Sequence, residues 1–186
     1  MRVISGKYGG RNLKTINSDK TRPTLDKVKE AVFSMIMPIV DVDYPALDLY
    51  AGSGALGIEA VSRGQASAYL VDKARAAYKI IEENISSLNA QEDFELFNMS
   101  ADLALSQIKE QLSLIFFDPP YDIADQVINK NISNIVELDL LIDGAIVVIE
   151  TKTETDILLP SSFELIKDKN YGIARIKIFR FNKEKI

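Results

Sequence analysis

The sequence predicts a doubly wound α/β fold, in which a mostly parallel sheet carries an antiparallel hairpin at its C-terminal edge. Short apolar runs alternate with segments of helical periodicity from residue 46 to residue 150. A glycine turn joins the first apolar run to a helix, and Tyr171-Gly172 separates two further runs near the C-terminus. With 186 residues, 47% of them hydrophobic, the chain can cover both faces of such a sheet in a single domain.

The first 24 residues are expected to form a small basic hairpin, an arm rather than part of the core formed by residues 25–186. Residues 1–30 contain eight cations and three anions, although the whole chain has a net charge of -5. A polyanion would therefore meet this segment first. A solvated arm without a partner is the alternative. The cations placed for such a contact are Lys7, Arg11, Lys14 and Arg22.

Helical and strand patterns alternate in the next hundred residues. The expected elements are a helix from Leu25 to Met37 capped by Thr24, a strand over 46–50, a helix over 55–63 ended by Gly64, a strand over 67–72, a helix over 76–88, a strand over 94–97 and a helix over 101–110 capped by Ser100.

Residues 112–117 form a near-continuous apolar run, which is typical of a strand buried on both faces of a parallel sheet. This strand leads into Asp118-Pro119-Pro120-Tyr121. The two prolines cannot continue a strand, and they stiffen the loop. The elements expected after the loop are a helix over 122–141, a buried strand over 144–150 and an antiparallel hairpin formed by 163–169 and 173–181.

The turn after the first strand fits the pattern G-x-G-x-x-G with Gly52, Gly54 and Gly57. Gly52 and Gly54 can adopt backbone angles that a side chain forbids, and Gly57 allows the helix to pack close to the strand. The pattern also fits dinucleotide-binding folds and ordinary tight turns. Asp48, four residues before Gly52, favours a ligand with a cationic amino-acid end, as in S-adenosylmethionine.

Asp72 ends the second strand 20 residues after Gly52. A carboxylate at this position can accept hydrogen bonds from both ribose hydroxyls of an adenosine. The alternative is an acid that is favoured by the dipole of the next helix. Ligands of open α/β sheets bind outside the carboxyl ends of the strands, so the glycine turn, Asp72 and residues 118–121 are expected to converge on one crevice.

The chain contains no cysteine and no histidine. This composition excludes disulfides, thiolate chemistry, imidazole bases and the usual zinc ligand sets, so no metal is expected. Neither a signal-peptide pattern nor an apolar run long enough to span a bilayer is found, and we therefore expect a cytoplasmic protein.

The loop 118–121 after the fourth strand, together with the glycine turn after the first, resembles the amino-methyltransferases that modify an exocyclic amine of a base. More closely, the chain resembles the RsmD-type 16S rRNA guanine-N2 methyltransferases of bacteria over nearly its whole length. The segments that carry this resemblance are 4–11, 22–24, 47–57, Glu59-Ala60, Ser62-Arg63-Gly64, 118–121 and Tyr171-Gly172.

The resemblance implies a Rossmann-like class I methyltransferase fold, S-adenosylmethionine as methyl donor, and 16S rRNA of the small ribosomal subunit or its assembly intermediate as substrate of a monomeric enzyme. The implied donor-binding residues are Arg22, Thr24, Asp48, Tyr50, Ala51, Gly52, Ser53, Gly54, Gly57, Asp72, Lys73, Ser100 and Ala101. The RNA contacts are then Lys7, Arg11, Lys14 and Arg22. Similar proteins often carry an acid where this chain has Ser100, and a hydroxyl gives the adenine amine a weaker hydrogen bond than a carboxylate does.

Methyl transfer from a sulfonium requires an aligned amine more than a strong base, which agrees with the absence of histidine. We expect the Asp118 side chain and the Pro119 carbonyl to accept the two amine hydrogens, Pro120 to stiffen the loop, and Tyr121 to stack on the extruded base. The alternatives are a helix-capping role for Asp118 and a core position for Tyr121.

Three other functions fit parts of the sequence. A DNA adenine-N6 or cytosine-N4 methyltransferase would share the loop, but it would usually require an added target-recognition region. A nicotinamide-binding oxidoreductase would explain the glycines and Asp72 but not the loop 118–121. A non-catalytic RNA-binding protein would not need both loops.

Overall fold

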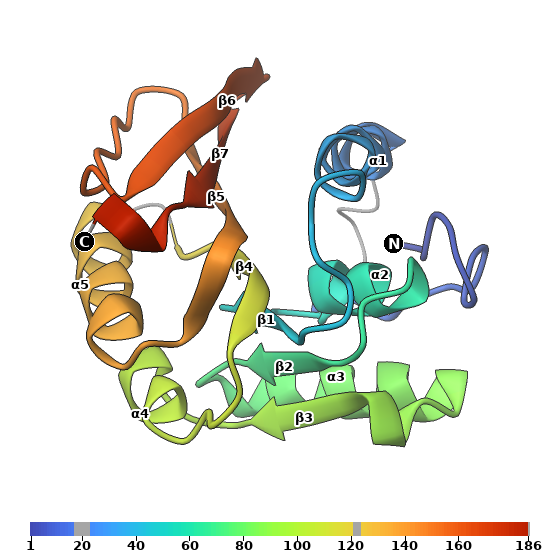
Figure 1. Ribbon diagram of the computed structural model, residues 1–186. Helices are drawn as coiled ribbons and strands as arrows, with labels where there is room; N and C mark the ends of the chain where they lie inside the picture. Colours follow the sequence, from blue (N-terminus) through green and yellow to red (C-terminus); the bar gives the residue numbers. More distant parts are fainter. Residues whose placement is uncertain (17–22, 121–123, 186) are drawn as a thin grey trace.

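The computed structural model describes residues 1–16, 23–120 and 124–185. Its sheet has seven strands in the order β3-β2-β1-β4-β5-β7-β6 (Figure 1). The strands are β1 (Ala46–Leu49), β2 (Ala68–Val71), β3 (Phe94–Phe97), β4 (Leu112–Phe117), β5 (Leu141–Lys152), β6 (Phe163–Tyr171) and β7 (Ala174–Phe181). The first five are parallel, whereas β7 pairs antiparallel with both β5 and β6. The predicted mostly parallel sheet with a C-terminal antiparallel hairpin is thus confirmed.

Helices cover both faces of the sheet, with α1 and α2 on one side and α4 and α5 on the other (Figure 1). The helices are α1 (Pro23–Ile36), α2 (Ala55–Ser62), α3 (Arg75–Leu88), α4 (Ala101–Leu105) and α5 (Ala124–Glu137), with short 3-10 turns η2 (Gln91–Asp93) and η4 (Lys183–Lys185). None of the described helices combines the length and the apolarity that crossing a membrane requires.

Successive side chains of β4 point to opposite faces of the sheet and pack into two separate layers of the core. Leu114 and Phe116 pack with residues of α1, α2 and α3, whereas Ile115 and Phe117 pack with residues of α4 and α5. The whole strand is buried, as its apolar composition predicts. Asp48 of β1 pairs in register with Phe116 and therefore lies on the α1 and α2 side of the sheet.

The N-terminal segment is not the separate arm that the sequence predicts. It forms a small hairpin, closed by an antiparallel bridge between Arg2 and Asn12, that packs on the body of the molecule. Val3 is 0% exposed and Leu13 is 4% exposed, and both belong to the α1, α2 and α3 layer of the core. Sequence spacing could not predict this packing, because the partners lie many residues away in the chain.

Helix α2 holds this hairpin in place. Gly6 has a φ of +85°, and a Cβ at this position would lie 1.7 Å from the Ser62 carbonyl oxygen. The Ser62 hydroxyl donates to the Ser5 carbonyl oxygen over 2.5 Å and accepts from the Tyr8 N–H over 3.0 Å. Only glycine therefore allows the hairpin to approach α2 so closely.

Two predicted helices are shorter in the structure. Helix α4 ends at Leu105 instead of residue 110, and Ile108, which follows it outside the helix, is buried in the core. Helix α5 ends at Glu137 instead of residue 141, because Leu141 already belongs to β5. Ser100 occupies the N-cap position of α4, but its hydroxyl makes no capping hydrogen bond with a described residue.

Candidate active site

Three cavities share residues at the carboxyl ends of β1, β2 and β4, and Tyr50 lines all of them. The α5-side cavity has a volume of about 170 Å³, the α1-side cavity about 260 Å³ and the open cavity about 430 Å³. Gly52 and Asp118 line the α1-side cavity together, and Asp72 and Asp118 line the open cavity together. The structure therefore brings these sequence-predicted residues to one connected region.

The backbone of the glycine turn is open toward ligands. Gly52 and Gly54 have φ values of 58° and 76°, and apart from Gly52 itself and its two chain neighbours no described residue has an atom within 4 Å of the position that a Cβ of Gly52 would occupy. Gly57 plays the predicted packing role, because its Cβ would lie 2.2 Å from Leu70 Cδ2 and 3.3 Å from Asp48 Cβ. Tyr50 also has a positive φ, 65°, a strained conformation that the sequence did not reveal.

Asp72 joins the glycine turn to the start of α3. Its Oδ2 accepts a hydrogen bond from the Gly52 N–H over 3.0 Å, and its Oδ1 accepts one from the Ala74 N–H over 2.8 Å. Ala74 is the N-cap residue of α3, so the carboxylate also lies where the helix dipole favours an acid. Each oxygen has a second lone pair, so Asp72 can accept additional hydrogen bonds from a ligand.

Asp48 is almost completely buried beneath the turn. It is 1% exposed, and its Oδ2 accepts a hydrogen bond from the Gly57 N–H over 2.9 Å. Burial raises the pKa of Asp48 to about 7, an effect that the Gly57 hydrogen bond opposes and the charge of Asp72 increases. The charge of Asp48 therefore changes near neutral pH.

Replacing Asp48 with asparagine is expected to stabilise the ligand-free protein at high pH. The folded-state pKa of about 7 lies above the ordinary 3.8, so the stability that the neutral acid provides is complete below pH 3.8 and is lost as the pH rises through 7. The stability of Asp48→Asn relative to the parent should rise by roughly 2 to 3 kcal/mol between pH 5 and pH 8. Urea unfolding of both proteins at both pH values measures this change. If the stability difference between Asp48→Asn and the parent were the same at pH 5 and pH 8, the raised pKa of Asp48 would be contradicted.

Asp118 directly follows β4 and reaches two of the cavities. Asp118 is exposed when the whole residue is considered, but protein atoms lie closely around its carboxyl group. This desolvation, together with the negative charges of Glu150 and Asp48, raises the pKa of Asp118 well above its ordinary value. Pro119 and Pro120 are not helical, so Asp118 is not the N-cap residue of a helix.

The two prolines that follow Asp118 have different environments. Pro119 is buried and Pro120 is exposed, and both line the open cavity. Three predicted site residues cannot be placed. Arg22 and Tyr121 lie outside the described residues, as does the side chain of Thr24 in the first turn of α1.

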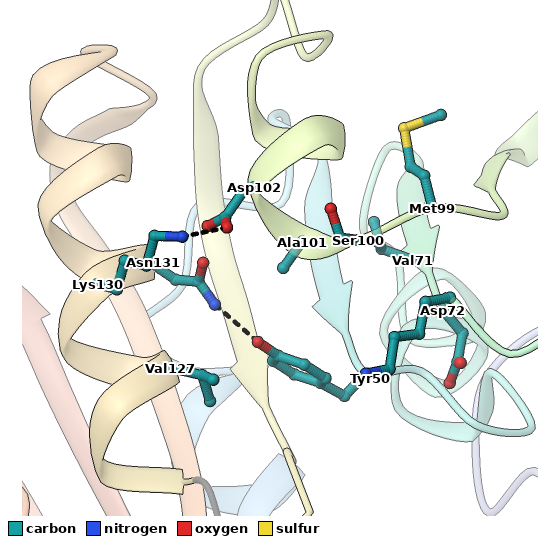
Figure 2. Close-up of a pocket in the computed structure, with 11 residues that line it drawn as sticks. Tyr50, Val71, Asp72, Met99, Ser100, Ala101, Asp102, Val127, Lys130 and Asn131 are labelled. Carbon is teal, nitrogen blue, oxygen red and sulfur yellow. Dashed lines mark hydrogen bonds and ion pairs between the residues drawn. The ribbon is translucent and has the colours of Figure 1, made fainter.

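Figure 2 shows the α5-side cavity, where Tyr50, which directly follows β1, meets residues from the end of β2, from α4 and from α5. The predicted residues Lys73, Ser100 and Ala101 line it. Asn131 of α5 points toward Tyr50, and its Nδ2 donates to the Tyr50 hydroxyl over 2.8 Å (Figure 2). Asn131 is not among the residues predicted from the sequence, although a polar residue on the apolar face of a helix is a detectable signal.

The cations of the N-terminal hairpin lie against η2 and α3. Lys7 Nζ lies 2.8 Å from Asp93 Oδ2, and Lys14 Nζ lies 2.9 Å from Glu83 Oε2. The Arg11 guanidinium donates to the Ser87 carbonyl oxygen over 2.5 Å. The side chains of Lys7 and Lys14 remain 48% and 69% exposed, so they are accessible as well as paired.

Comparison with known proteins identifies the family. The family described as "Conserved hypothetical protein 95" (Cons_hypoth95) matches residues 1–180. The chain belongs to this family. The Bacillus subtilis protein named "Putative rRNA methyltransferase YlbH" is 36% identical over 97% of this chain and 98% of its own length. Ribosomal RNA small subunit methyltransferase D of Escherichia coli K12 is 31% identical over 97% of this chain and 89% of its own length. The predicted resemblance to the RsmD type is therefore confirmed.

Solved structures agree with this assignment. The structure described as "Putative methyltransferase yhhF from Escherichia coli" is 29% identical, covers 98% of both chains and gives a TM-score of 0.85. TrmN from Thermus thermophilus gives a TM-score of 0.67 at 18% identity, covering 87% of this chain and 51% of its own, which is a likeness of fold alone. The strand order and the antiparallel C-terminal strands are those of the class I S-adenosylmethionine-dependent methyltransferase fold.

Proposed function

We propose that this protein transfers a methyl group from S-adenosylmethionine to the exocyclic N2 amine of a guanine in 16S rRNA of the small ribosomal subunit. The names of its relatives support the choice of rRNA. The observation that carries the proposal is that Gly52 and Asp118 line the same cavity. This arrangement lets the turn suited to the donor and the loop suited to the acceptor face one another across a short distance.

The residues around the turn fit S-adenosylmethionine. The open backbone at Gly52 would admit the ligand. The Asp48 carboxylate would provide negative charge for its cationic amino-acid end. The Asp72 carboxylate would accept hydrogen bonds from its ribose hydroxyls. The adenine of the bound donor would occupy the α5-side cavity, which Lys73 and Ser100 line. The remaining proposed contacts are Arg22, Thr24, Tyr50, Ala51, Ser53, Gly54, Gly57 and Ala101.

Asp118 and its loop would hold the acceptor base. The Asp118 carboxylate and the Pro119 carbonyl accept the two amine hydrogens, which directs the nitrogen lone pair toward the donor, and Tyr121 stacks on the base. The bound donor supplies an electrophilic methyl group, whose bond to sulfur breaks with its electron pair staying on sulfur while the N2–CH3 bond forms. The nitrogen then loses a proton, and the raised pKa of Asp118 makes this carboxylate a suitable acceptor.

Mass-spectrometric mapping of small-subunit rRNA from cells with and without the protein tests the proposal directly. We expect one N2-methylguanine to be absent without the protein and to be restored by purified protein and S-adenosylmethionine on small-subunit particles. Free rRNA and duplex DNA serve as comparison substrates. Methylation of DNA alone would overturn the choice of substrate, and an unchanged set of rRNA modifications would overturn the function.

The N-terminal hairpin is the proposed RNA contact. Surface ion pairs contribute little stability, so RNA phosphates can replace Asp93 and Glu83 as partners of Lys7 and Lys14. Each phosphate contact contributes about 0.7 to 0.9 to the slope of log affinity against log salt. The triple variant Lys7→Gln, Arg11→Gln, Lys14→Gln should therefore bind RNA more weakly and reduce this slope by roughly 2.

Filter binding of small-subunit rRNA at several salt concentrations measures this slope. Lys109→Gln is a matched control, because Lys109 is exposed and lies between α4 and β4, next to Ile108 of the core layer on the opposite face of the sheet from the hairpin. A slope equal to that of the parent protein would show that the hairpin cations do not contact RNA.

A further inference from the structure

Glu150 extends a row of side chains that leads to Asp118. Phe116 of β4 and Val148 of β5 are paired in register, and both line the α1-side cavity. Side chains two residues apart in a strand lie on the same face, so the next residues in this row are Asp118 and Glu150. Both of them line the same cavity.

The same wall of the cavity presents carboxylates from three neighbouring strands. Asp48 of β1 is paired with Phe116, and Glu150 is paired with Ile176 of β7. Lys29 also lines the cavity, but its Nζ lies 3.0 Å from Glu59 Oε2 and donates to the Arg2 carbonyl oxygen over 2.6 Å. The wall next to Asp118 is therefore rich in hydrogen-bond acceptors, and it suits a ligand edge that carries several donors.

Guanine has such an edge. Its N1–H lies directly beside its N2 amine, so the base presents neighbouring donors. Adenine and cytosine carry a ring nitrogen that accepts hydrogen bonds beside their exocyclic amine, and a carboxylate would repel it. A carboxylate has about four acceptor positions, so Glu150 can accept a hydrogen bond from a base and keep an interaction within the protein.

We infer that Glu150 is a specificity-determining residue, whose carboxylate accepts the N1–H of the guanine that Asp118 and Pro119 hold by its N2 amine. This inference rests on the proposed function and goes beyond it, because it assigns the choice of base to a residue outside the loop 118–121. A site built to pair with a particular donor rejects analogues without it, because the buried acceptor then remains unpaired.

Substitution of the target base by 2-aminopurine separates the two hydrogen bonds. This base keeps the 2-amine that receives the methyl group, but its N1 carries no hydrogen. The substrate is small-subunit rRNA ligated from two pieces, with guanine or 2-aminopurine at the mapped position. The parent protein should prefer guanine on the order of 10²-fold or more in kcat/KM.

Glu150→Gln should reverse much of this preference, since its carboxamide can donate to the bare N1 of 2-aminopurine. We expect kcat/KM for guanine to fall on the order of 10- to 100-fold, and the guanine preference to fall at least about tenfold. Glu150→Asp keeps the carboxylate and should keep the preference for guanine at a lower rate. Glu164→Gln, an exposed position on β6, is the control and should behave like the parent.

Thermal unfolding and S-adenosylmethionine titration of each variant separate a loss of structure from a loss of specificity. An unchanged guanine preference in folded Glu150→Gln would overturn the inference while the proposed function stands. A loss of guanine preference in Glu150→Asp equal to that in Glu150→Gln would also overturn it. Failure of the parent protein to methylate the guanine-containing rRNA would overturn the proposed function itself, and the inference with it.

Discussion

Replacing Asp118 with alanine is expected to lower kcat for methyl transfer on the order of 10²- to 10³-fold or more, because the variant no longer aligns the amine or takes up its proton. The dissociation constant for S-adenosylmethionine should be nearly unchanged, since the glycine turn and Asp72 remain intact. Single-turnover methylation and calorimetric titration of the donor measure the two effects separately.

Asp43→Ala provides the control for this variant. Asp43 is exposed in the loop that precedes β1, at the edge of the sheet opposite to the cavities. Its activity should equal that of the parent protein. Full activity of Asp118→Ala would contradict the proposed role of the carboxylate.

The raised pKa of Asp118 also predicts the pH dependence of the reaction. Asp118 can accept the proton only in its ionised form, so kcat/KM should fall as the pH drops through the pKa of this residue. Because that pKa is raised, the fall should occur at a higher pH than an ordinary aspartate would give. Glu150→Gln removes one of the charges that raise this pKa. The acid limb of the pH profile should therefore move to lower pH in this variant.

Replacing Glu59 with alanine is expected to cost about 3 to 5 kcal/mol of unfolding free energy. Glu59 is 0% exposed and accepts hydrogen bonds from the Ile4 N–H over 2.8 Å and the Ser5 N–H over 3.1 Å. It also pairs with Lys29 at 3.0 Å and with Arg63 at 2.7 Å. The alanine variant would leave a buried ammonium and two backbone donors without their partner, which accounts for the large loss.

Urea unfolding measures this loss, and amide hydrogen exchange of residues 1–13 should show the hairpin opening at a lower free energy than the rest of the molecule. Glu83→Ala removes the exposed partner of Lys14 and should change stability by less than about 0.5 kcal/mol. Equal stabilities of the two variants would show that Glu59 does not hold the hairpin.

The parts of the fold that local patterns specify were predictable from the sequence. Short buried strands such as β4 have a distinctive apolar composition, and glycines mark the turn that follows β1. The position of the hairpin was not predictable, because Val3 and Leu13 become core residues only through contacts with distant helices. Helix ends were uncertain for a similar reason, since tertiary packing decides where α4 and α5 stop.

The candidate site likewise contains residues that could be selected from the sequence and residues that could not. Asp48, Asp72 and Asp118 could be selected because each lies at a fixed distance from a recognisable turn or follows a recognisable strand. Glu150 has no such local signal, and its place in the cavity depends on the pairing of β4 with β5. Asn131 does carry a local signal, as a polar residue on the apolar face of a helix, but its partner Tyr50 is apparent only in the folded chain.

The hydrogen bond between Asn131 and Tyr50 joins two parts of the molecule that have separate tasks in the proposed reaction. Tyr50 opens the glycine turn with a φ of 65°, and Asn131 lies in α5, the first described helix after Pro120. A displacement of α5 would therefore have to break this hydrogen bond or move Tyr50 with the helix. A ligand or crosslink that immobilises this helix would thereby also restrain the residue at which the glycine turn begins.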